Sequence, residues 1–217
     1  MRGIIFDLDG TLIDTAEDIA IALNRALADE KLPTYSISGV VAMVGNGARR
    51  LIADAVGNQD VETLDRVYDR YREHYRQVLT LNSRAYEGIH ALLRELNRRD
   101  IPISVLTNKP ESDAQEIIKR IFEDIVFATV TGGRESVPVK PDIRAGEYVT
   151  KVTGIPLADM MMVGDGKADI KFAQNAGMTM VAVSWGFSSR EQLINAGATT
   201  IVDNANDILT IFDKLSK

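Results

Sequence analysis

The sequence predicts an α/β protein, a Rossmann-like doubly wound parallel sheet core with an inserted all-helical cap domain. Short apolar runs alternate with amphipathic stretches along most of the 217 residues, a pattern typical of parallel βα units. The apolar runs are continuous, as expected for strands that are covered on both faces. Residues 14–86 differ, because they show helical periodicity and no convincing strand.

The continuous apolar runs give the expected core strands. We place strands at residues 4–6, 103–106, 126–130, 160–163, 180–183 and, on weaker evidence, 200–202. The helix expected after the fourth of these has Ala168, Phe172, Ala173 and Ala176 on one face, and Gly177 is its expected end.

The segment between residues 14 and 86 is predicted to be entirely helical. Thr15 followed by Asp18 has the spacing of a capping box at the start of a helix. Three apolar faces at helical spacing follow: Ile19, Leu23, Ala26 and Leu27; Leu51, Ile52, Ala55 and Val56, closed by Gly57; and Leu64, Tyr68, Tyr71, Tyr75 and Val78. We therefore assign residues 1–13 and 87–217 to the core and residues 14–86 to the cap. The tyrosines are interpreted as part of the interior of the cap.

Composition excludes several classes of site and partner. The chain has no Cys, which removes disulfides, thiolate zinc sites and Cys nucleophiles, and it has two His. The net charge of −6 gives no electrostatic basis for binding nucleic acid. No apolar run approaches the ~20 residues of a membrane span, and the N-terminus has no signal pattern. We expect a cytoplasmic protein without nucleic-acid or membrane partners.

The strongest local signal is the pair of carboxylates in the run Asp7-Leu8-Asp9-Gly10-Thr11. It directly follows the first expected strand, at the end of a parallel sheet where ligands bind. Two acidic groups at this spacing suit a hard cation, or a nucleophile paired with a general acid. Taken alone, the run is also consistent with a turn followed by a helix cap.

Two further motifs lie later in the chain. Thr107-Asn108-Lys109 follows the second expected strand, where a hydroxyl and an amide could bind anionic oxygens. Lys140-Pro141 precedes a helical stretch and supplies a positive charge. Each has an ordinary structural alternative: a turn for the first motif and a solvated loop for the second.

The last motif repeats the arrangement of the first. Gly164, Asp165 and Gly166 follow the fourth expected strand, and Asp169 lies one helical turn further on. Asp169 could therefore face the same pocket as Asp165. The alternative is an acidic residue that is favoured by the helix dipole in the first turn.

In this order the four motifs resemble the haloacid dehalogenase-like hydrolase superfamily. Its signature is D-x-D-G-T, then S/T, then K, then G-D-x-x-x-D, and the resemblance covers the whole chain. The presence of Asp9 implies phosphoryl transfer rather than dehalogenation. Residues 44–51 and 136–142 resemble the phosphoglycolate phosphatases within the superfamily. Two residues depart from that pattern: Ile143 replaces a frequent Pro, and Gly166 replaces the usual Ser.

The resemblance implies a nucleophile, an acid–base residue and a metal. Asp7 would attack phosphorus and form an aspartyl-phosphate, while Asp9 would protonate the leaving alcohol and later activate water. The implied cofactor is Mg²⁺, bound by the side chains of Asp7 and Asp165 and by the backbone carbonyl of Asp9.

The resemblance assigns the other motif residues to the transferring phosphoryl group. Lys140 would neutralise charge on the nucleophile and on a phosphoryl oxygen. Thr107 and Asn108 would donate hydrogen bonds to the transferring group. Asp169 would orient Lys140 or a metal-bound water.

The expected function is Mg²⁺-dependent hydrolysis of a small phosphomonoester such as 2-phosphoglycolate. Candidate substrate-binding residues in the cap are Gly45, Asn46, Gly47, Arg49 and Arg50, the arginines because a guanidinium fork matches a carboxylate. The alternatives are a sugar-phosphate phosphatase or β-phosphoglucomutase-like phosphotransferase, and a non-catalytic regulator that binds phosphate or Mg²⁺. The sequence leaves open whether the protein is a monomer or a homodimer.

Overall fold

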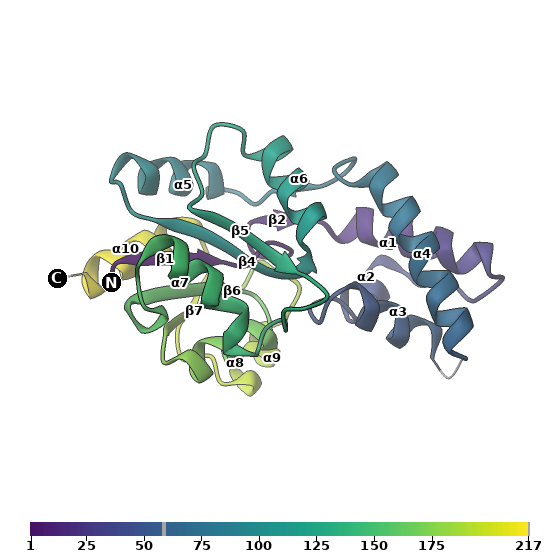
Figure 1. Ribbon diagram of the computed structural model, residues 1–217. Helices are drawn as coiled ribbons and strands as arrows, with labels where there is room; N and C mark the ends of the chain where they lie inside the picture. Colours follow the sequence, from purple (N-terminus) through teal and green to yellow (C-terminus); the bar gives the residue numbers. More distant parts are fainter. Residues whose placement is uncertain (58–59, 217) are drawn as a thin grey trace.

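The computed structural model describes residues 1–57 and 60–216 and has a parallel sheet at its centre (Figure 1). Six strands lie in the order β5-β4-β1-β6-β7-β8, and every neighbouring pair is parallel. Their bounds are β1 (Gly3–Phe6), β4 (Ile103–Pro110), β5 (Thr129–Gly133), β6 (Met160–Gly164), β7 (Thr179–Val183) and β8 (Ile201–Val202). Because β1 lies between β4 and β6, the residues that follow these three strands meet at one edge of the sheet.

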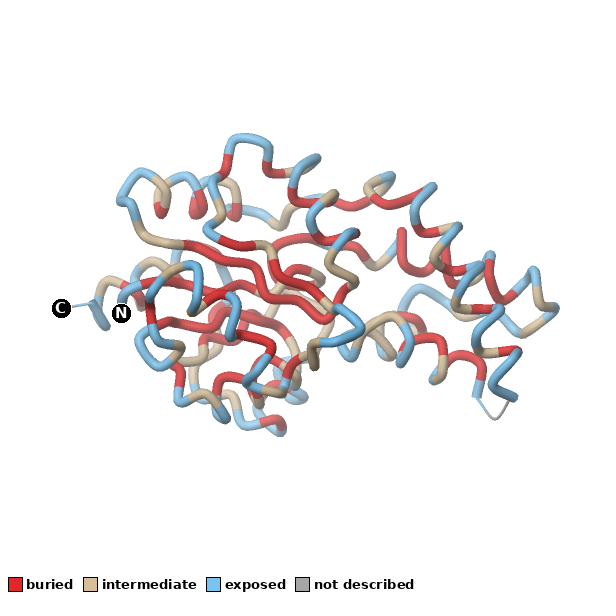
Figure 2. Tube along the Cα trace, viewed as in Figure 1, coloured by how far each residue is buried: buried red, intermediate tan, exposed pale blue. Residues whose placement is uncertain are grey.

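Helices cover both faces of this sheet, which confirms the doubly wound α/β prediction. Ile4 and Phe6 of β1 pack with the apolar residues of α5 (Ile89–Arg98), α6 (Glu111–Ile121) and α10 (Ala205–Leu215). Ile5 points to the other face, against α7 (Glu147–Thr153) and α8 (Lys167–Ala176). The remaining elements are α9 (Arg190–Ala196) and the 3-10 helices η1 (Ile143–Gly146) and η2 (Leu157–Asp159). The central strands are buried along their length (Figure 2).

The strand expected at residues 126–130 is displaced in the structure, where β5 begins at Thr129. Val126 is exposed, and its backbone exchanges two hydrogen bonds with the side chain of Asn97. Its N–H and C=O are therefore tied to the end of α5. The polar residues Thr129 and Thr131 pair with β4 instead. The apolar run at residues 126–130 therefore did not predict the position of this strand correctly.

Four helices form a separate layer beyond the carboxyl edge of the sheet (Figure 1). They are α1 (Ala16–Asp29), α2 (Ile37–Val41), α3 (Ala48–Val56) and α4 (Val61–Val78), here called the helical insert. The antiparallel strands β2 (Ile13–Asp14) and β3 (Arg84–Ala85) pair where the chain enters and leaves it. The expectation of no strand between residues 14 and 86 is therefore wrong at both ends. Two-residue strands are too short to show any periodicity.

The residues expected to form a capping box connect parts of the fold instead. The Thr15 hydroxyl donates to Asp9 Oδ1 at 2.7 Å and makes no cap hydrogen bond. Asp18 is fully buried and accepts the backbone N–H groups of Asn82 and Ser83, each at 2.9 Å. The capping-box prediction is wrong because both side chains have partners elsewhere in the fold, which fix the start of α1.

Other local predictions in the helices are confirmed. Helix α3 ends at Gly57 and α8 at Gly177, both with positive φ. Tyr71 and Tyr75 are buried on α4, and their rings stack with centroids 5.5 Å apart. Among the described residues no helix is long and apolar enough to cross a membrane.

Candidate active site

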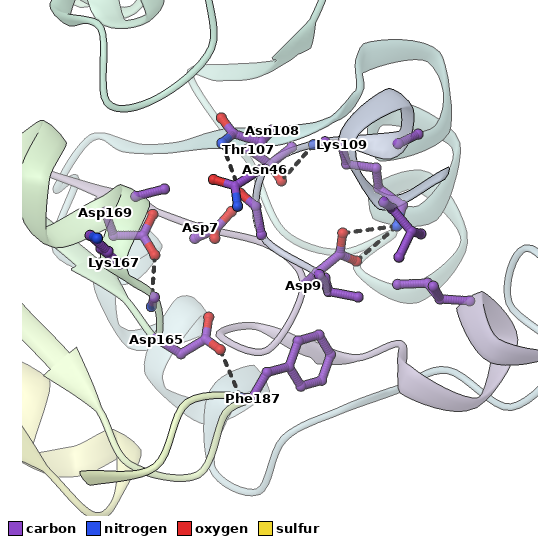
Figure 3. Close-up of a pocket in the computed structure, with 18 of the residues that line it drawn as sticks. Asp7, Asp9, Asn46, Thr107, Asn108, Lys109, Asp165, Lys167, Asp169 and Phe187 are labelled. Atoms are coloured by element: carbon purple, nitrogen blue, oxygen red, sulfur yellow. Dashed lines mark hydrogen bonds and ion pairs between the residues drawn. The ribbon is translucent and has the colours of Figure 1, made fainter. Parts of the chain in front are cut away.

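The motif residues converge on one pocket between the sheet and the helical insert (Figure 3). Asp7 follows β1, Thr107 lies in β4 and Asp165 follows β6, so three adjacent strands deliver them to the same edge. The cavity volume is about 170 Å³. Residues of the insert, including Gly45 and Tyr71, form the opposite wall.

Asp7 occupies the middle of this pocket. Its Oδ1 accepts the Leu8 N–H at 2.7 Å and lies 3.0 Å from Lys140 Nζ. Burial, followed by repulsion from Asp169, raises the pKa of Asp7 to about 7, although Lys140 opposes the shift. A cation that joined the site would therefore favour the ionised form of Asp7.

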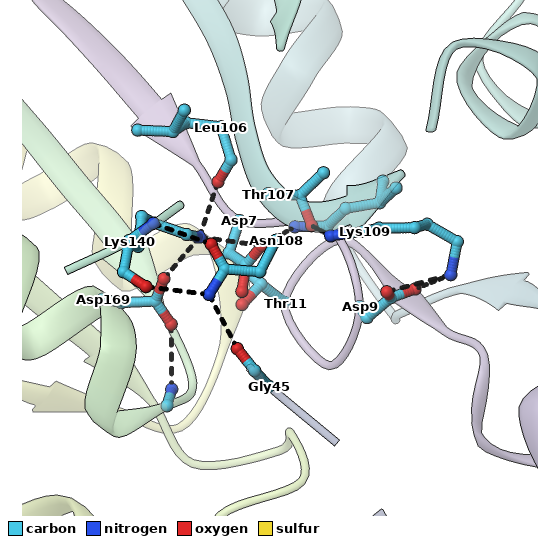
Figure 4. Close-up of polar contacts among 12 residues, drawn as sticks. Asp7, Asp9, Thr11, Gly45, Leu106, Thr107, Asn108, Lys109, Lys140 and Asp169 are labelled. Carbon is cyan, nitrogen blue, oxygen red and sulfur yellow. Dashed lines mark hydrogen bonds and ion pairs between the residues drawn. The ribbon is translucent and has the colours of Figure 1, made fainter. Parts of the chain in front are cut away.

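Lys140 lies in the interior between Asp7 and Asp169 (Figure 4). Only 1% of its side chain is exposed, and Nζ donates to Leu106 O at 2.6 Å and to Asp169 Oδ1 at 2.7 Å. Burial by itself would lower the pKa of Lys140, but the charges of Asp169 and Asp7 outweigh it and raise that pKa. The ammonium is thus charged and fixed in one position beside Asp7.

Asp169 holds Lys140 in place from the start of α8. Besides the Lys140 ammonium, it accepts the Gly166 N–H at 3.0 Å, so both carboxylate oxygens have a donor. A Cβ at Gly166 would meet Asp169 Oδ2 at 3.4 Å, an ordinary contact. Glycine at position 166 is therefore not required by packing.

Asp165 faces the same space from the end of β6. Its oxygens accept the Thr11 hydroxyl at 2.9 Å and the Phe187 N–H at 2.7 Å. Burial and the charges of Asp7 and Asp169 raise its pKa well above the usual range. Gly10 has a φ of +79°, and a Cβ there would lie 2.2 Å from Asp165 Oδ2. Glycine is thus required for the turn after β1 to pass this close to Asp165.

Three carboxylates are close enough to surround a cation. One oxygen each from Asp7, Asp165 and Asp169 lies within 4.8 Å of the others. Oxygen ligands of this kind suit Mg²⁺, and the excess of buried negative charge favours a cation there. Asp169 is already paired with the Lys140 ammonium at 2.7 Å. Asp165 instead accepts a neutral hydroxyl and a neutral backbone N–H, so Asp165 is the better-placed partner of Asp7 for a cation.

Asp9 points away from that cluster toward Lys109 (Figures 3 and 4). Lys109 Nζ donates to both Asp9 oxygens, at 2.8 and 2.9 Å, and lies 4.7 Å from the centre of the Tyr75 ring. The two acids of the first motif therefore have different neighbours. Sequence reasoning gave Lys109 no role, although its place at the end of β4, beside β1, was a usable signal.

Asn108 connects the core to the helical insert. Its Nδ2 donates to Gly45 O at 2.9 Å and to Lys140 O at 3.0 Å, and its Oδ1 accepts the Lys140 N–H at 2.9 Å. In this arrangement the amide positions the two loops and has no hydrogen left for a phosphoryl group. Thr107 lines the pocket, and its Oγ1 accepts the Lys109 N–H at 3.3 Å. The Thr107 hydroxyl hydrogen is thus available as a donor.

The five candidates in the insert separate into two groups. Gly45, Asn46 and Gly47 line the pocket, whereas Arg49 and Arg50 do not. The Arg49 side chain is 71% exposed and pairs with Asp65, and that of Arg50 is 64% exposed and pairs with Asp54. The structure does not bring the arginines to the pocket, because Ala48 and Leu51 occupy the inward face of α3.

A family model described as haloacid dehalogenase-like hydrolase matches residues 4–183. A phosphoglycolate phosphatase of Agrobacterium fabrum is 33% identical, over 97% of this chain and 92% of its own. A phosphoglycolate phosphatase of Colwellia psychrerythraea is 30% identical, over 95% of this chain and 94% of its own.

Solved structures give the same result for the fold. A predicted phosphoglycolate phosphatase from Haemophilus somnus superposes with a TM-score of 0.89 at 28% identity, covering 98% of both chains. A predicted phosphatase from Clostridium acetobutylicum superposes with a TM-score of 0.87 at 26% identity, also covering 98% of both chains.

Proposed function

We propose that this chain, which belongs to the haloacid dehalogenase-like hydrolase family, is a Mg²⁺-dependent phosphomonoesterase that works through an aspartyl-phosphate on Asp7. As substrate we propose 2-phosphoglycolate or a similarly small phosphate. The observation that carries the proposal is the separation of the two acids after β1. Asp7 lies beside Lys140 and belongs to the carboxylate cluster, whereas Asp9 lies apart from the cluster, beside Lys109.

In the first step an Asp7 oxygen attacks phosphorus and the bond to the leaving oxygen breaks. The electron pair of that bond remains on the leaving oxygen, which takes a proton from Asp9. Lys140 holds positive charge beside Asp7, and the Thr107 hydroxyl can donate to a phosphoryl oxygen. A Mg²⁺ ion held by Asp7, Asp165 and the Asp9 carbonyl would offset the repulsion between carboxylate and phosphate.

In the second step water hydrolyses the phosphoenzyme. Asp9, now ionised, removes a proton from the water as its oxygen attacks phosphorus, and the bond to Asp7 breaks. Phosphate leaves, and both carboxyl groups return to their starting state. Residues of the insert line one wall of the pocket, and closure of the insert over a bound substrate would limit the access of bulk water during the first step.

The size of the pocket supports a small substrate. Its volume of about 170 Å³ is below the ~300–1,000 Å³ of pockets for drug-sized ligands. The similarity to phosphoglycolate phosphatases along nearly the whole chain supports a substrate of that kind.

The test is phosphate release from 2-phosphoglycolate, a panel of sugar phosphates and p-nitrophenyl phosphate, with Mg²⁺ and then with EDTA. We expect metal-dependent turnover that prefers 2-phosphoglycolate and is lost in Asp7→Asn. Preference for a sugar phosphate would support the proposed phosphatase mechanism and contradict 2-phosphoglycolate as the substrate. No release by folded protein would contradict the proposal and favour a binding protein.

A further inference from the structure

Two lysines line the pocket among the residues that the structure describes, and they lie on opposite sides of Asp7 (Figure 3). Lys167 is exposed and lies beside Asp169, on the side where the carboxylates cluster. Lys109 lies beside Asp9 on the other side. If Asp9 protonates the leaving oxygen, then Lys109 is the pocket cation next to the leaving group.

We infer that Lys109 binds a carboxylate carried by the leaving alcohol, and that it thereby selects phosphomonoesters with an acidic leaving group. This inference rests on the proposed function and adds a specificity residue to it. It also replaces the sequence-based expectation for Arg49 and Arg50, both of which point away from the pocket.

The surroundings of Lys109 suit this role. Only 4% of its side chain is exposed, and Nζ is fixed by Asp9 and by the face of the Tyr75 ring. An ammonium that is already desolvated and immobile loses little entropy when an anion binds. A buried lysine charge also requires an anionic partner, and Asp9 supplies it when no substrate is bound.

Asp9 is fully engaged in this arrangement. Its two oxygens accept the Lys109 ammonium, and Oδ1 also accepts the Thr15 hydroxyl at 2.7 Å. A substrate carboxylate would give Lys109 a second anion, so that Asp9 could turn from Lys109 toward the leaving oxygen. A neutral leaving group has no anion that could take the place of Asp9 beside Lys109. The carboxylate of 2-phosphoglycolate is one carbon away from the ester oxygen, so one substrate can reach both residues.

The experiment compares 2-phosphoglycolate with its neutral amide, which has nearly the same shape and lacks the charge. The preference is kcat/KM for the acid divided by kcat/KM for the amide, with Mg²⁺ present. We expect a strong preference for the acid in the wild type, and a reduction of about 30-fold or more in Lys109→Met. Because the preference is a ratio, a general loss of activity in the variant cancels. Lys151→Met, an exposed lysine on α7, is the matched control and should keep the wild-type preference.

The outcomes separate this inference from the proposed function. Equal activity on acid and amide in the wild type would overturn the inference and leave the phosphatase in place. So would a preference that Lys109→Met retains, or one that is lost in Arg49→Met or Arg50→Met instead. If Lys109→Met is inactive on both substrates, the dissociation constants of the acid and the amide are compared in Asp7→Asn and in Asp7→Asn with Lys109→Met, and an unchanged ratio would overturn the inference. No metal-dependent release from any phosphomonoester would overturn the proposed function itself.

Discussion

At the scale of single residues, the site depends on a chain of charges that runs from Asp169 through Lys140 to Asp7. Lys140 lies within 3.0 Å of Asp7 and within 2.7 Å of Asp169. Asp169 does not need to touch the substrate to matter, because it fixes the ammonium beside Asp7, the proposed nucleophile. We propose a positioning role for Asp169, and the loss of such a partner typically costs 10–100-fold in activity.

Asp169→Asn keeps the shape of the side chain and removes its charge. We expect kcat to fall by about 10- to 100-fold while the protein stays folded, because Lys140 loses its nearer anion. Steady-state kinetics with p-nitrophenyl phosphate measures kcat. The pH dependence of kcat is measured as well, and its acidic limb should move if the variant changes the balance of charges around Asp7. Asp142→Asn, a half-buried acid outside the pocket that pairs with the exposed Arg144, is the matched control. A kcat within twofold of the wild type would contradict the positioning role.

The raised pKa of Asp7 predicts how pH and Mg²⁺ act together on stability. Without metal, folded Asp7 holds its proton up to about pH 7, whereas the ordinary value is 3.8. The folded state thus binds more protons between these values, and this carboxyl makes stability fall as pH rises from about 4 to about 7. Mg²⁺ requires ionised ligands, so the gain in Tm on adding Mg²⁺ should be larger at pH 8 than at pH 5.5.

Thermal unfolding at the two pH values, with Mg²⁺ or EDTA, measures that difference. Asp7→Asn should show a smaller gain with less dependence on pH. An increase in Tm with Mg²⁺ that is the same at both pH values, or larger at pH 5.5, would contradict a metal site at Asp7.

At the scale of elements, side-chain contacts such as the following two hold the helical insert against the core. One is the Asn108 amide, which bonds the Gly45 carbonyl. The other is the buried ion pair between Arg72 of α4 and Asp113 of α6, in which Arg72 Nη2 lies 3.1 Å from Asp113 Oδ1. Both cross from one layer to the other, so they hold the insert, which forms one wall of the pocket, against the core.

Arg72→Met removes the cation from this pair and leaves the Asp113 carboxylate buried without it. We expect a loss of about 3–5 kcal/mol in the free energy of unfolding, measured by urea titration. The double variant Arg72→Met with Asp113→Asn should recover part of the loss, because the uncompensated charge is then absent. Arg49→Met, which breaks an exposed pair, should cost less than about 1 kcal/mol. Equal losses in Arg72→Met and Arg49→Met would contradict this account.

The elements that the sequence predicts well are those with buried periodic patterns. The apolar runs of β1, β4, β6 and β7 and the ends of α3 and α8 agree with the structure. Predictions failed where a side chain had a distant partner. Asp18 bonds residues 82 and 83 instead of capping its own helix, and Asn97 holds the backbone of Val126 out of β5. Such pairings involve residues far apart in the chain, which local patterns do not describe.

At the scale of the whole molecule, the topology explains why motifs far apart in sequence form one site. The order β4-β1-β6 places the residues after three strands at one edge, so Asp7, Thr107 and Asp165 could be expected to meet. The sequence could not show which way the side chains of the insert point. Arg49 and Arg50 face outward, while Lys109, which sequence reasoning left without a role, pairs with Asp9. These orientations depend on the packing of α3 against α4 and of β4 against β1.

The central claim is that Asp7 carries the phosphoryl group, and it can be tested by trapping the phosphoenzyme. In Asp9→Asn the base for the second step is missing, whereas p-nitrophenolate leaves without needing a proton from residue 9. The variant should therefore accumulate a phosphoenzyme when mixed with p-nitrophenyl phosphate and Mg²⁺. Acid quench and peptide mass mapping should place the phosphoryl group on Asp7, and the variant carrying both Asp7→Asn and Asp9→Asn should show none. Phosphorylation of another residue, or turnover of the wild type with no phosphoenzyme in Asp9→Asn, would contradict the account.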